Sequence, residues 1–569
     1  MKRSARRFAP PFSLPAEHFA AALVWLVLGS AGLVAVAPDL ARGGFLQFRV
    51  VAVTHLFTLG WITTTLFGAL YEIAPVALQT PARGIRTGHA GFWALTGGIA
   101  CLAGGSWFQA PVWLAPGWLL ILAAVGVHIW NLRPPSDPPA RVRYIGPYVQ
   151  SARLVLVLAL LLIGANIGAY QGWWSVDRTG ILAAHAHLAA VGFATLAVVG
   201  VGSRLLPMFL LARVHPSWPL RWIGPLLLVG LCAFAGGTIR GVGALEVGGG
   251  VVLAASLALY LYLAGSYFRR RERRRLGSDL VQMAVAHAFL GVATVLGLGL
   301  LLSRPADPQA VAAYGVVGIL GWLALMVGGV YARIVPFLRW LHRFGKRAGE
   351  PGVPRIGDLG SGPLGWIRLL LLSAGAGTLA LAIDAASRSG AVLGAGIFGL
   401  GALSLALEVV RSPGAARSEP ARAGADRSAE SGGTRHRLDV RPILARGEEP
   451  LNRILASAER IPEGGALEIV APFEPVPLCR ALARRGFAHR ARPESSGAWI
   501  VRFTRTSITP SSTIAQVFEA YPATEAVLAD HGLDLCCGRD KTLEFAAGAH
   551  ALELDELLAE LHRAACPAD

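Results

Sequence analysis

The chain has 569 residues, of which 54% are hydrophobic and 15% charged, and its mean hydropathy is +0.52. Soluble proteins carry about 25% charged residues, so this composition excludes an ordinary water-soluble globular enzyme. The net charge of +17 does not indicate a nucleic-acid-binding protein, because residues 1–411 hold 33 Lys and Arg against 13 Asp and Glu, whereas residues 412–569 hold 19 against 22. The positive excess therefore lies in the apolar part, where a membrane explains it better than DNA. Six cysteines, scattered apart from Cys536 and Cys537, exclude a secreted disulfide scaffold.

Twelve apolar runs are long enough to cross a membrane. A hydrocarbon core of about 30 Å requires about 20 helical residues. The runs cover residues 19–38, 49–78, 90–109, 113–132, 153–171, 181–210, 221–239, 244–267, 279–303, 310–338, 365–385 and 390–410. The sequence therefore predicts a mostly α protein, in which residues 1–411 form a twelve-helix transmembrane bundle in a lipid bilayer.

The loops between these runs predict the orientation of the bundle. Basic residues favour cytoplasmic loops. One set of alternate loops carries the basic run at 269–275 together with Lys346 and Arg347, whereas the opposite set holds only Arg42, Arg49, Arg178, Arg240, Arg304 and Arg388. With an even number of spans, both termini are expected in the cytoplasm, and the expected location is a bacterial inner membrane.

A motif recurs in every fourth run. The second run contains a histidine, two glycines, an acidic residue and a proline, namely His55, Gly60, Gly68, Glu72 and Pro75. At an offset of 132 the sixth run contains His187, Gly192, Gly200, Arg204 and Pro207, and at a further offset of 129 the tenth contains Val316, Gly321, Gly329, Arg333 and Pro336. The bundle is therefore expected to be three units of four helices, whereas common transporter folds show a twofold repeat.

The equivalent histidines are the first candidate site. A histidine within a membrane span is costly and by default functional. His55 and His187 could each present an imidazole towards a shared interior, a geometry suited to haem iron or copper. His185 lies about 200° round the helix from His187, so one of these two must face elsewhere. The alternative is that these imidazoles only hydrogen-bond between helices.

Further histidines and charges fall within or near the spans. His287, in the ninth run, is equally open to a structural role and to metal ligation. Glu72, Arg204 and Arg333 share one repeat position and could form an ionic cluster across the bundle, or the two arginines could extend to the interface. Four other histidines are expected at span ends, namely His89, His128, His215 and His342.

Twelve spans in three units, with His55 in the second and His187 in the sixth, resemble subunit I of the haem-copper oxidase superfamily, and the NnrS haem-copper membrane proteins look like a functional relative. The resemblance covers residues 19–410 and implies that His55 is a haem ligand and His187 a copper or haem ligand. The chain departs from the family pattern because the seventh run has no adjacent histidine pair and the tenth has no His-x-His motif. We therefore expect a site with fewer ligands than in the family, which holds one metal ion or one haem.

The tail begins with residues 412–435, a flexible linker rich in Ala, Ser, Gly, Arg and Glu. Residues 436–506 alternate as strand, helix, strand, helix, strand and strand, which predicts a small two-layer α/β domain. The segment contains the motif Leu438-Asp439-Val440-Arg441 and resembles the TusA/SirA-like family, specifically its branch of unknown function. Sulfur-carrier members have a cysteine just after the first strand, where this chain has Arg441-Pro442-Ile443, so no persulfide relay is expected. Cys479 is expected to be a core residue.

The last segment, 511–569, is expected to be a small helical domain. It contains His531-Gly532-Leu533-Asp534-Leu535-Cys536-Cys537-Gly538 and resembles the amino-terminal domain of the ScdA/RIC proteins, which repair iron centres after nitrosative damage. The resemblance marks Cys536 and Cys537 as the functional pair. Thiols at a helix start have a lowered pKa and bind iron or zinc as thiolates. The alternative is that both thiols only fill a helix turn.

These features favour an inner-membrane haem- or copper-binding protein in nitric oxide metabolism or the nitrosative stress response. Nitric oxide is the candidate ligand, a cytochrome or quinol is the candidate electron donor, and the cysteine pair would handle iron or thiol chemistry. Two other functions stay open. One is a respiratory subunit that catalyses nitric oxide or oxygen reduction, and the other is a non-redox transporter with a sensory tail.

Overall fold

The structure is a computed structural model, and the chain divides into two compact units that are described separately. One unit comprises Met1–Arg271, Leu276–His342 and Leu359–Pro413, and the other is built mainly from Gly414–Asp569. The structure describes residues 12–78, 82–133, 145–176, 178–210, 212, 218–273, 275–303, 306–344, 362–411, 435–446, 448–494, 497–531, 533, 541–549 and 552–566.

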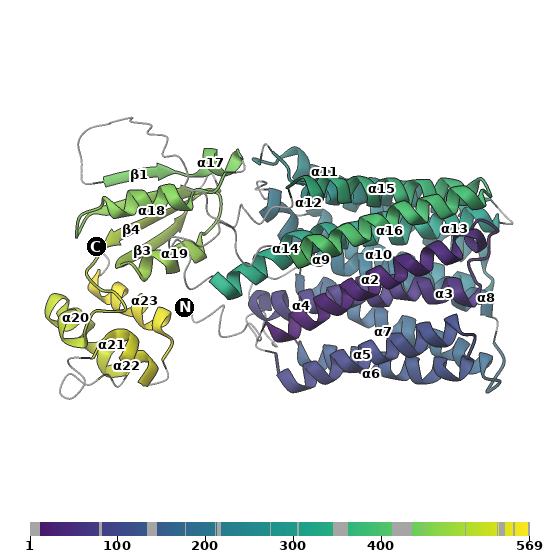
Figure 1. The fold of residues 1–569 in the computed structure, drawn as a ribbon, viewed down its shortest axis with the longest axis horizontal. Coiled ribbons are helices and arrows are strands. Elements are labelled where there is room, and N and C mark those ends of the chain that lie inside the picture. Colours follow the sequence, from purple (N-terminus) through teal and green to yellow (C-terminus); the bar gives the residue numbers. More distant parts are fainter. Residues whose placement is uncertain are drawn as a thin grey trace. The chain divides into compact units, whose positions relative to one another are not determined.

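The first unit is a bundle of long helices (Figure 1). In chain order the helices are α2 (Ser13–Leu40), α3 (Phe48–His55), η1 (Leu56–Thr63), α4 (Thr64–Leu78), α5 (Ile85–Trp107), η2 (Pro111–Trp113), α6 (Leu114–Asn131), α7 (Ile145–Tyr170), α8 (Arg178–His187), η4 (Leu188–Ala194), α9 (Thr195–Leu210), α10 (Trp218–Arg240), α11 (Gly243–Arg269), α12 (Ser278–Leu302), α13 (Pro308–Val316), η5 (Val317–Ala324), α14 (Leu325–Phe344), α15 (Gly362–Asp384) and α16 (Arg388–Arg411). A helix therefore forms at each of the twelve apolar runs.

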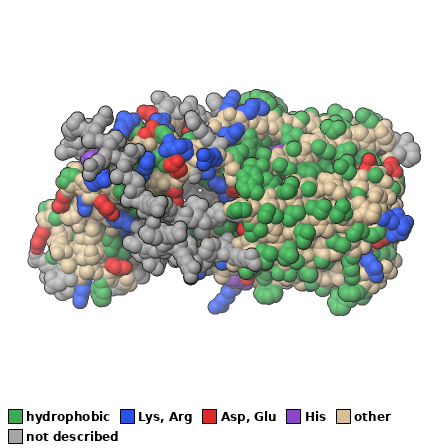
Figure 2. All heavy atoms as spheres, turned by 45° about the horizontal axis from the view of Figure 1, so that its top comes forward, with side chains coloured by type: hydrophobic (Ala, Val, Ile, Leu, Met, Phe, Trp, Pro, Cys, Tyr) green, Lys and Arg blue, Asp and Glu red, His purple; other side chains and the backbone are tan. Residues whose placement is uncertain are grey.

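Among the described residues, eleven helices are long and apolar enough to cross a membrane, rather than the expected twelve. The remaining one, α5, is 23 residues long, but it contains Arg86, His89 and several glycines, which lower its hydropathy. The visible face of the bundle is covered largely by hydrophobic side chains (Figure 2). Large apolar residues on different helices, such as Leu154, Leu381 and Val410, are more than half exposed, as expected for a surface that contacts lipid.

Three π-helical segments mark the threefold repeat. Segment η1 begins directly after His55, η4 directly after His187 and η5 directly after Val316. A π-helix is rare, and its backbone hydrogen bonds join residues that are five apart in the chain instead of four. In the first two segments a threonine hydroxyl donates to the carbonyl five residues earlier, Thr63 to Thr58 at 2.8 Å and Thr195 to Ala190 at 3.1 Å. The same local geometry thus recurs at the spacing of the sequence repeat.

The three π-helices contact one another, and their aromatic residues link each repeat to another. Trp61 of the first repeat donates to the Ala324 carbonyl of the third at 3.4 Å, and Trp322 of the third donates to the Thr195 hydroxyl of the second at 3.3 Å. Phe193, the equivalent of these tryptophans in the second repeat, meets Phe67 of the first, with ring centroids 6.4 Å apart. The contacts close a ring in which each repeat touches both others.

The second unit contains a mixed four-stranded sheet with helices (Figure 1). Its elements are β1 (Arg435–Asp439), α17 (Arg441–Ala445), α18 (Leu451–Glu459), β2 (Ala466–Ala471), α19 (Val476–Ala483), β3 (Phe487–Pro493) and β4 (Trp499–Arg505). The strand order is β1-β2-β4-β3, with β1 parallel to β2 and the other neighbours antiparallel. Leu467, Val501 and Phe503 lie fully buried in its core, and Cys479 packs there as expected.

Helices complete this unit: α20 (Ile514–Ala520), η8 (Pro522–Thr524), α21 (Glu525–Asp530), α22 (Leu543–Ala549) and α23 (Leu554–Ala565). A capping box joins Thr513 and Gln516 at the start of α20. Leu528, Leu558 and Leu561 form a separate apolar core. Helix α23 nevertheless packs against β3 and α19, so the helical segment and the sheet domain share contacts.

Candidate functional site

His55 and His185 are brought together by the bundle. His55 ends α3 in the first repeat, and His185 lies near the end of α8 in the second. Their ring centroids are 6.4 Å apart and their ring planes differ by 26°. Two half-buried imidazoles from different repeats therefore face a shared space inside an apolar bundle.

The hydrogen bonds of both rings determine which nitrogen is available. His55 donates from Nδ1 to the Val51 carbonyl at 2.8 Å, and His185 donates from Nδ1 to the Ala159 carbonyl at 3.0 Å. A carbonyl oxygen can only accept, so each Nδ1 carries the proton and each neutral ring keeps its lone pair on Nε2. Metal-ligating histidines commonly have this arrangement, in which the second nitrogen is fixed by a backbone carbonyl.

The spacing of the rings fits a shared metal ion. An ion about 2 Å from each Nε2 places the two ring centroids on the order of 6 Å apart. Among the described residues, no group of three or more His, Cys, Asp and Glu side chains could hold a metal ion. A four-ligand structural zinc site therefore does not fit this pair. Two histidines alone would be enough only for a cofactor or cation that needs no more than two protein ligands.

His187 has different neighbours from those expected. Its Nδ1 donates to the Ala183 carbonyl at 2.9 Å, and its Nε2 lies 3.3 Å from the Tyr314 hydroxyl, which donates to it. Its ring also contacts Phe234, at 4.4 Å between centroids. The structure thus pairs His55 with His185, whereas His187 is directed towards the third repeat.

His287 is a hydrogen-bonded core residue. Its Nδ1 donates to the Met283 carbonyl at 2.6 Å, and its Nε2 accepts from the Tyr260 hydroxyl at 3.0 Å. Trp322 packs against the same ring. Both nitrogens are therefore occupied, which favours the structural role over metal ligation.

The three residues of the expected ionic cluster do not pair with one another among the described residues. Arg333 pairs instead with Asp279, with 2.5 Å between Nη1 and Oδ2, and stacks over Phe209. Arg204 is exposed, as expected of an arginine that extends to the interface. Glu72 is half-buried and its Oε2 has no hydrogen-bond partner. Equivalent positions in the repeats therefore have different surroundings.

One buried ion pair has no counterpart in the sequence-based expectations. Arg368 of α15 pairs with Glu408 of α16, and both side chains are almost fully buried. Arg368 also donates to Gln282 of α12 at 3.1 Å, and Gln282 donates to the Leu325 carbonyl directly after η5 at 2.9 Å. This network ties the last two helices, α15 and α16, to the first two helices of the third repeat. The sequence signal that could have indicated this pair is that Arg368 and Glu408 are ionisable residues within the last two apolar runs.

Two of the four histidines expected at span ends can be placed. His89 is partly exposed and lies 2.8 Å from the Glu17 carboxylate. His128, in contrast, is only 1% exposed. The placement of the His215 and His342 side chains lies outside the described residues.

The expected cysteine site of the tail, Cys536 and Cys537, lies outside the described residues. Nearby, His531 pairs with Glu560 of α23 at 2.6 Å. This contact joins the start of the cysteine-containing segment to the last helix.

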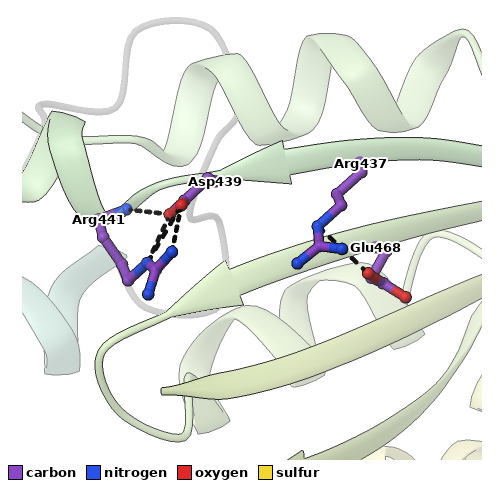
Figure 3. Close-up of polar contacts among 4 residues, drawn as sticks. All are labelled: Arg437, Asp439, Arg441 and Glu468. Carbon is purple, nitrogen blue, oxygen red and sulfur yellow. Dashed lines mark hydrogen bonds and ion pairs between the residues drawn. The ribbon is translucent and has the colours of Figure 1, made fainter. Parts of the chain in front are cut away.

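Asp439 at the end of β1 and Arg441 just after it are joined by several hydrogen bonds (Figure 3). Asp439 accepts from the Arg441 backbone at 3.0 Å and from its guanidinium at 2.6 and 2.9 Å. The Arg441 side chain lowers the pKa of the Asp439 carboxyl. Arg437 and Glu468, on the paired strands β1 and β2, lie 3.5 Å apart. The paired groups stabilise the turn after β1.

Comparison with known proteins gives one match. No curated protein matches the chain. Residues 437–505 match the family model described as an uncharacterized conserved protein (DUF2249), and this segment covers the sheet domain from Arg437 in β1 to the last residue of β4, Arg505.

Proposed function

We propose that the membrane unit holds one haem iron or copper ion between His55 and His185, and that the protein acts in nitric oxide metabolism or the nitrosative stress response. The observation that carries the proposal is the opposed ring pair, with centroids 6.4 Å apart and both Nδ1 atoms bonded to carbonyls. His185 takes the role of second ligand in place of His187.

The residues around the pair orient the ligands. The bonds to Val51 and Ala159 hold each ring in one tautomer with Nε2 available, so little rearrangement accompanies binding. The apolar helices limit the access of water, which strengthens the bonds between Nε2 and a cation. If present, haem iron held by both histidines would supply a centre that passes an electron, and a copper ion of low coordination number would supply one with open positions for nitric oxide.

The link to nitric oxide has two supports from the sequence. The three-unit bundle resembles the haem-copper oxidase superfamily and the NnrS proteins, and the last segment resembles the iron-repair domain of the ScdA/RIC proteins. We propose that Cys536 and Cys537 bind iron in the cytoplasm as thiolates. A cytochrome or quinol would donate electrons to the membrane centre.

The proposed setting is a bacterial inner membrane with both termini in the cytoplasm. Helix α5 would also span the membrane and bring the number of spans to twelve. It packs along α6, and Gly98 and Gly117 allow the two backbones to approach closely. The distribution of basic loop residues supports this orientation. Cysteine labelling at loop positions from either side of the membrane would test it.

Spectroscopy of the detergent-purified full chain tests the proposal. The protein is produced in cells supplied with haem precursor and copper, and spectra are recorded oxidised, reduced and after nitric oxide treatment. We expect about one haem or copper per chain, apart from any iron at the cysteine pair, and a nitric-oxide-dependent shift in the spectrum. A colourless protein without bound copper or iron would contradict the proposal.

The tail has its own test. The double variant Cys536→Ser plus Cys537→Ser in the full chain should lose the iron that is bound by the tail. It should keep the metal or haem of the membrane unit and therefore the visible spectrum of the wild type. Unchanged iron content would show that the cysteine pair is not a metal site.

A further inference from the structure

A second group of polar side chains is buried where α6 ends and α7 begins. His128 is 1% exposed and Arg153 is 2% exposed. Ionisable residues buried within membrane spans are costly and usually bind something or pair with one another. These two residues belong to neither the histidine pair nor the buried ion pair described above.

Several polar atoms of this group have no hydrogen-bond partner. They are both ring nitrogens of His128, Nε and Nη2 of Arg153, and Nε2 of Gln150, one turn before Arg153 on α7. Arg153 uses only Nη1, which donates to the Leu132 carbonyl at 3.0 Å. The unpartnered atoms of Arg153 and Gln150 are all donors, and His128 can donate from either nitrogen. The group therefore lacks an acceptor.

The free atoms of Arg153 have a particular geometry. Nε–H and Nη2–H lie along the same edge of the planar guanidinium, and this edge binds the two oxygens of a carboxylate in parallel. The edge is buried and unpaired, whereas the remaining nitrogen anchors the side chain to α6. Arg153 thus presents a complete bidentate donor to the interior of the protein.

His128 is held by rings rather than by hydrogen bonds. It stacks on Phe67 with centroids 3.8 Å apart and planes at 8°, and the edge of Tyr71 meets it at 4.9 Å and 83°. His18, His55, His187 and His287 each bond a backbone carbonyl, but His128 does not. Both its nitrogens are therefore kept in place and unoccupied.

The charge of Arg153 is also uncompensated among the described residues. Glu17 forms its ion pair with His89, and Glu72 forms no ion pair with Arg153 and has an unpartnered oxygen of its own. A buried charge without a counter-ion costs several kcal/mol. A bound anion would remove this cost and supply the missing acceptor.

We propose that Arg153, with His128 and Gln150, binds a small planar oxyanion of the size of formate, nitrite or bicarbonate. Two oxygens of the anion accept from the Nε and Nη2 edge of Arg153. This site does not depend on the metal site at His55 and His185.

Anion titration of the detergent-purified full chain tests the proposal. Sodium formate and sodium nitrite are compared with sodium chloride at equal ionic strength, by calorimetry and by the unfolding temperature. The wild type should bind both oxyanions saturably and unfold at a higher temperature in their presence. Arg153→Met should weaken binding about tenfold or more, and its unfolding temperature without oxyanion should be no lower than that of the wild type.

Arg204→Met is the matched control, because Arg204 is an exposed arginine on a neighbouring span, and it should bind oxyanions like the wild type. If Arg153→Met does not fold, His128→Phe, which keeps the ring stack, and Gln150→Leu provide the same comparison and should each weaken binding. No saturable binding, an equal response to chloride, or binding unchanged in these variants would overturn the proposal.

Discussion

Tyr314 meets His187 with ring centroids 6.0 Å apart and planes at 22°, which repeats the contact of His185 with His55, at 6.4 Å and 26°. The reason is the internal repeat, because Tyr314 follows His185 at the same offset of 129 that relates the third repeat to the second. The contact between the first and second repeats is thus formed by two imidazoles, those of His55 and His185. The equivalent contact between the second and third repeats is formed by the imidazole of His187 and the phenol of Tyr314. Only the first contact offers two metal-ligating nitrogens.

This equivalence predicts that a second metal-binding pair can be created. Tyr314→His should place an imidazole opposite His187 as His185 lies opposite His55. We expect haem or copper content to rise towards two per chain, measured by metal analysis and the visible spectrum. Tyr314→Phe is the control and should leave metal content at one. An unchanged content in Tyr314→His would show that the spacing alone does not make a site.

The repeat glycines should be sensitive to small substitutions. A Cβ on Gly60 would lie 2.6 Å from the Cβ of Trp25, which is fixed to the backbone and cannot swing away. Gly60→Ala should therefore destabilise the bundle by about 1–3 kcal/mol, measured as the change in unfolding free energy in detergent. Gly318→Ala is the control, because no atom lies within 4 Å of its added Cβ. Equal effects of the two substitutions would refute the close packing at Gly60.

The buried pair of Arg368 and Glu408 should be costly to break. Arg368→Met leaves the Glu408 carboxylate without this counter-ion, and we expect a loss of about 3–5 kcal/mol in unfolding free energy. The double variant Arg368→Met plus Glu408→Leu should recover most of that loss. Arg42→Ala, in a largely exposed pair with Asp39, should cost less than about 1 kcal/mol. A double variant as unstable as Arg368→Met would contradict a charge-based explanation.

The tail should lose stability in mild acid through His562. Its Nε2 donates to the Ala483 carbonyl at 2.9 Å, its Nδ1 lies 3.0 Å from the Thr506 hydroxyl, and burial lowers its pKa below 6.5. The unfolded chain then binds more protons than the folded one, so this contribution is fully present above about pH 6.5 and is lost as the pH falls towards the lower pKa.

Hydrogen exchange of α23 amides in the full chain, between pH 7.5 and 5, measures this effect after correction for intrinsic exchange. Protection in the wild type should decrease as the pH falls from 7.5 to 5, whereas His562→Gln should weaken this dependence. His436→Gln, at an exposed position in β1, is the control and should behave like the wild type. A dependence that persists in full in His562→Gln would assign it to another group.

Much of the local structure follows from hydrophobic patterns. The order of strands and helices predicted for residues 436–506 is observed as β1, α18, β2, α19, β3 and β4, with the short helix α17 in addition. These elements are determined by period-two and period-four patterns over short segments.

Hydrophobic patterns could not predict which residues the site residues contact. The choice between His185 and His187 depends on the rotation of α8, and no pattern signals that a π-helix begins after His187. Arg368 and Glu408 are charged residues within apolar runs, but their pairing depends on how α15 and α16 pack. His128 was expected at an interface because it lies near a helix end, yet neighbouring rings cover it.

The most direct measurement is the metal content and visible spectrum of three purified variants, His55→Ala, His185→Ala and His187→Ala, against the wild type. If His55 and His185 are the two ligands, each of the first two variants loses the metal or changes its axial-ligand spectrum, whereas His187→Ala keeps both. A spectrum unchanged in His185→Ala, with the metal lost from His187→Ala, would contradict the account.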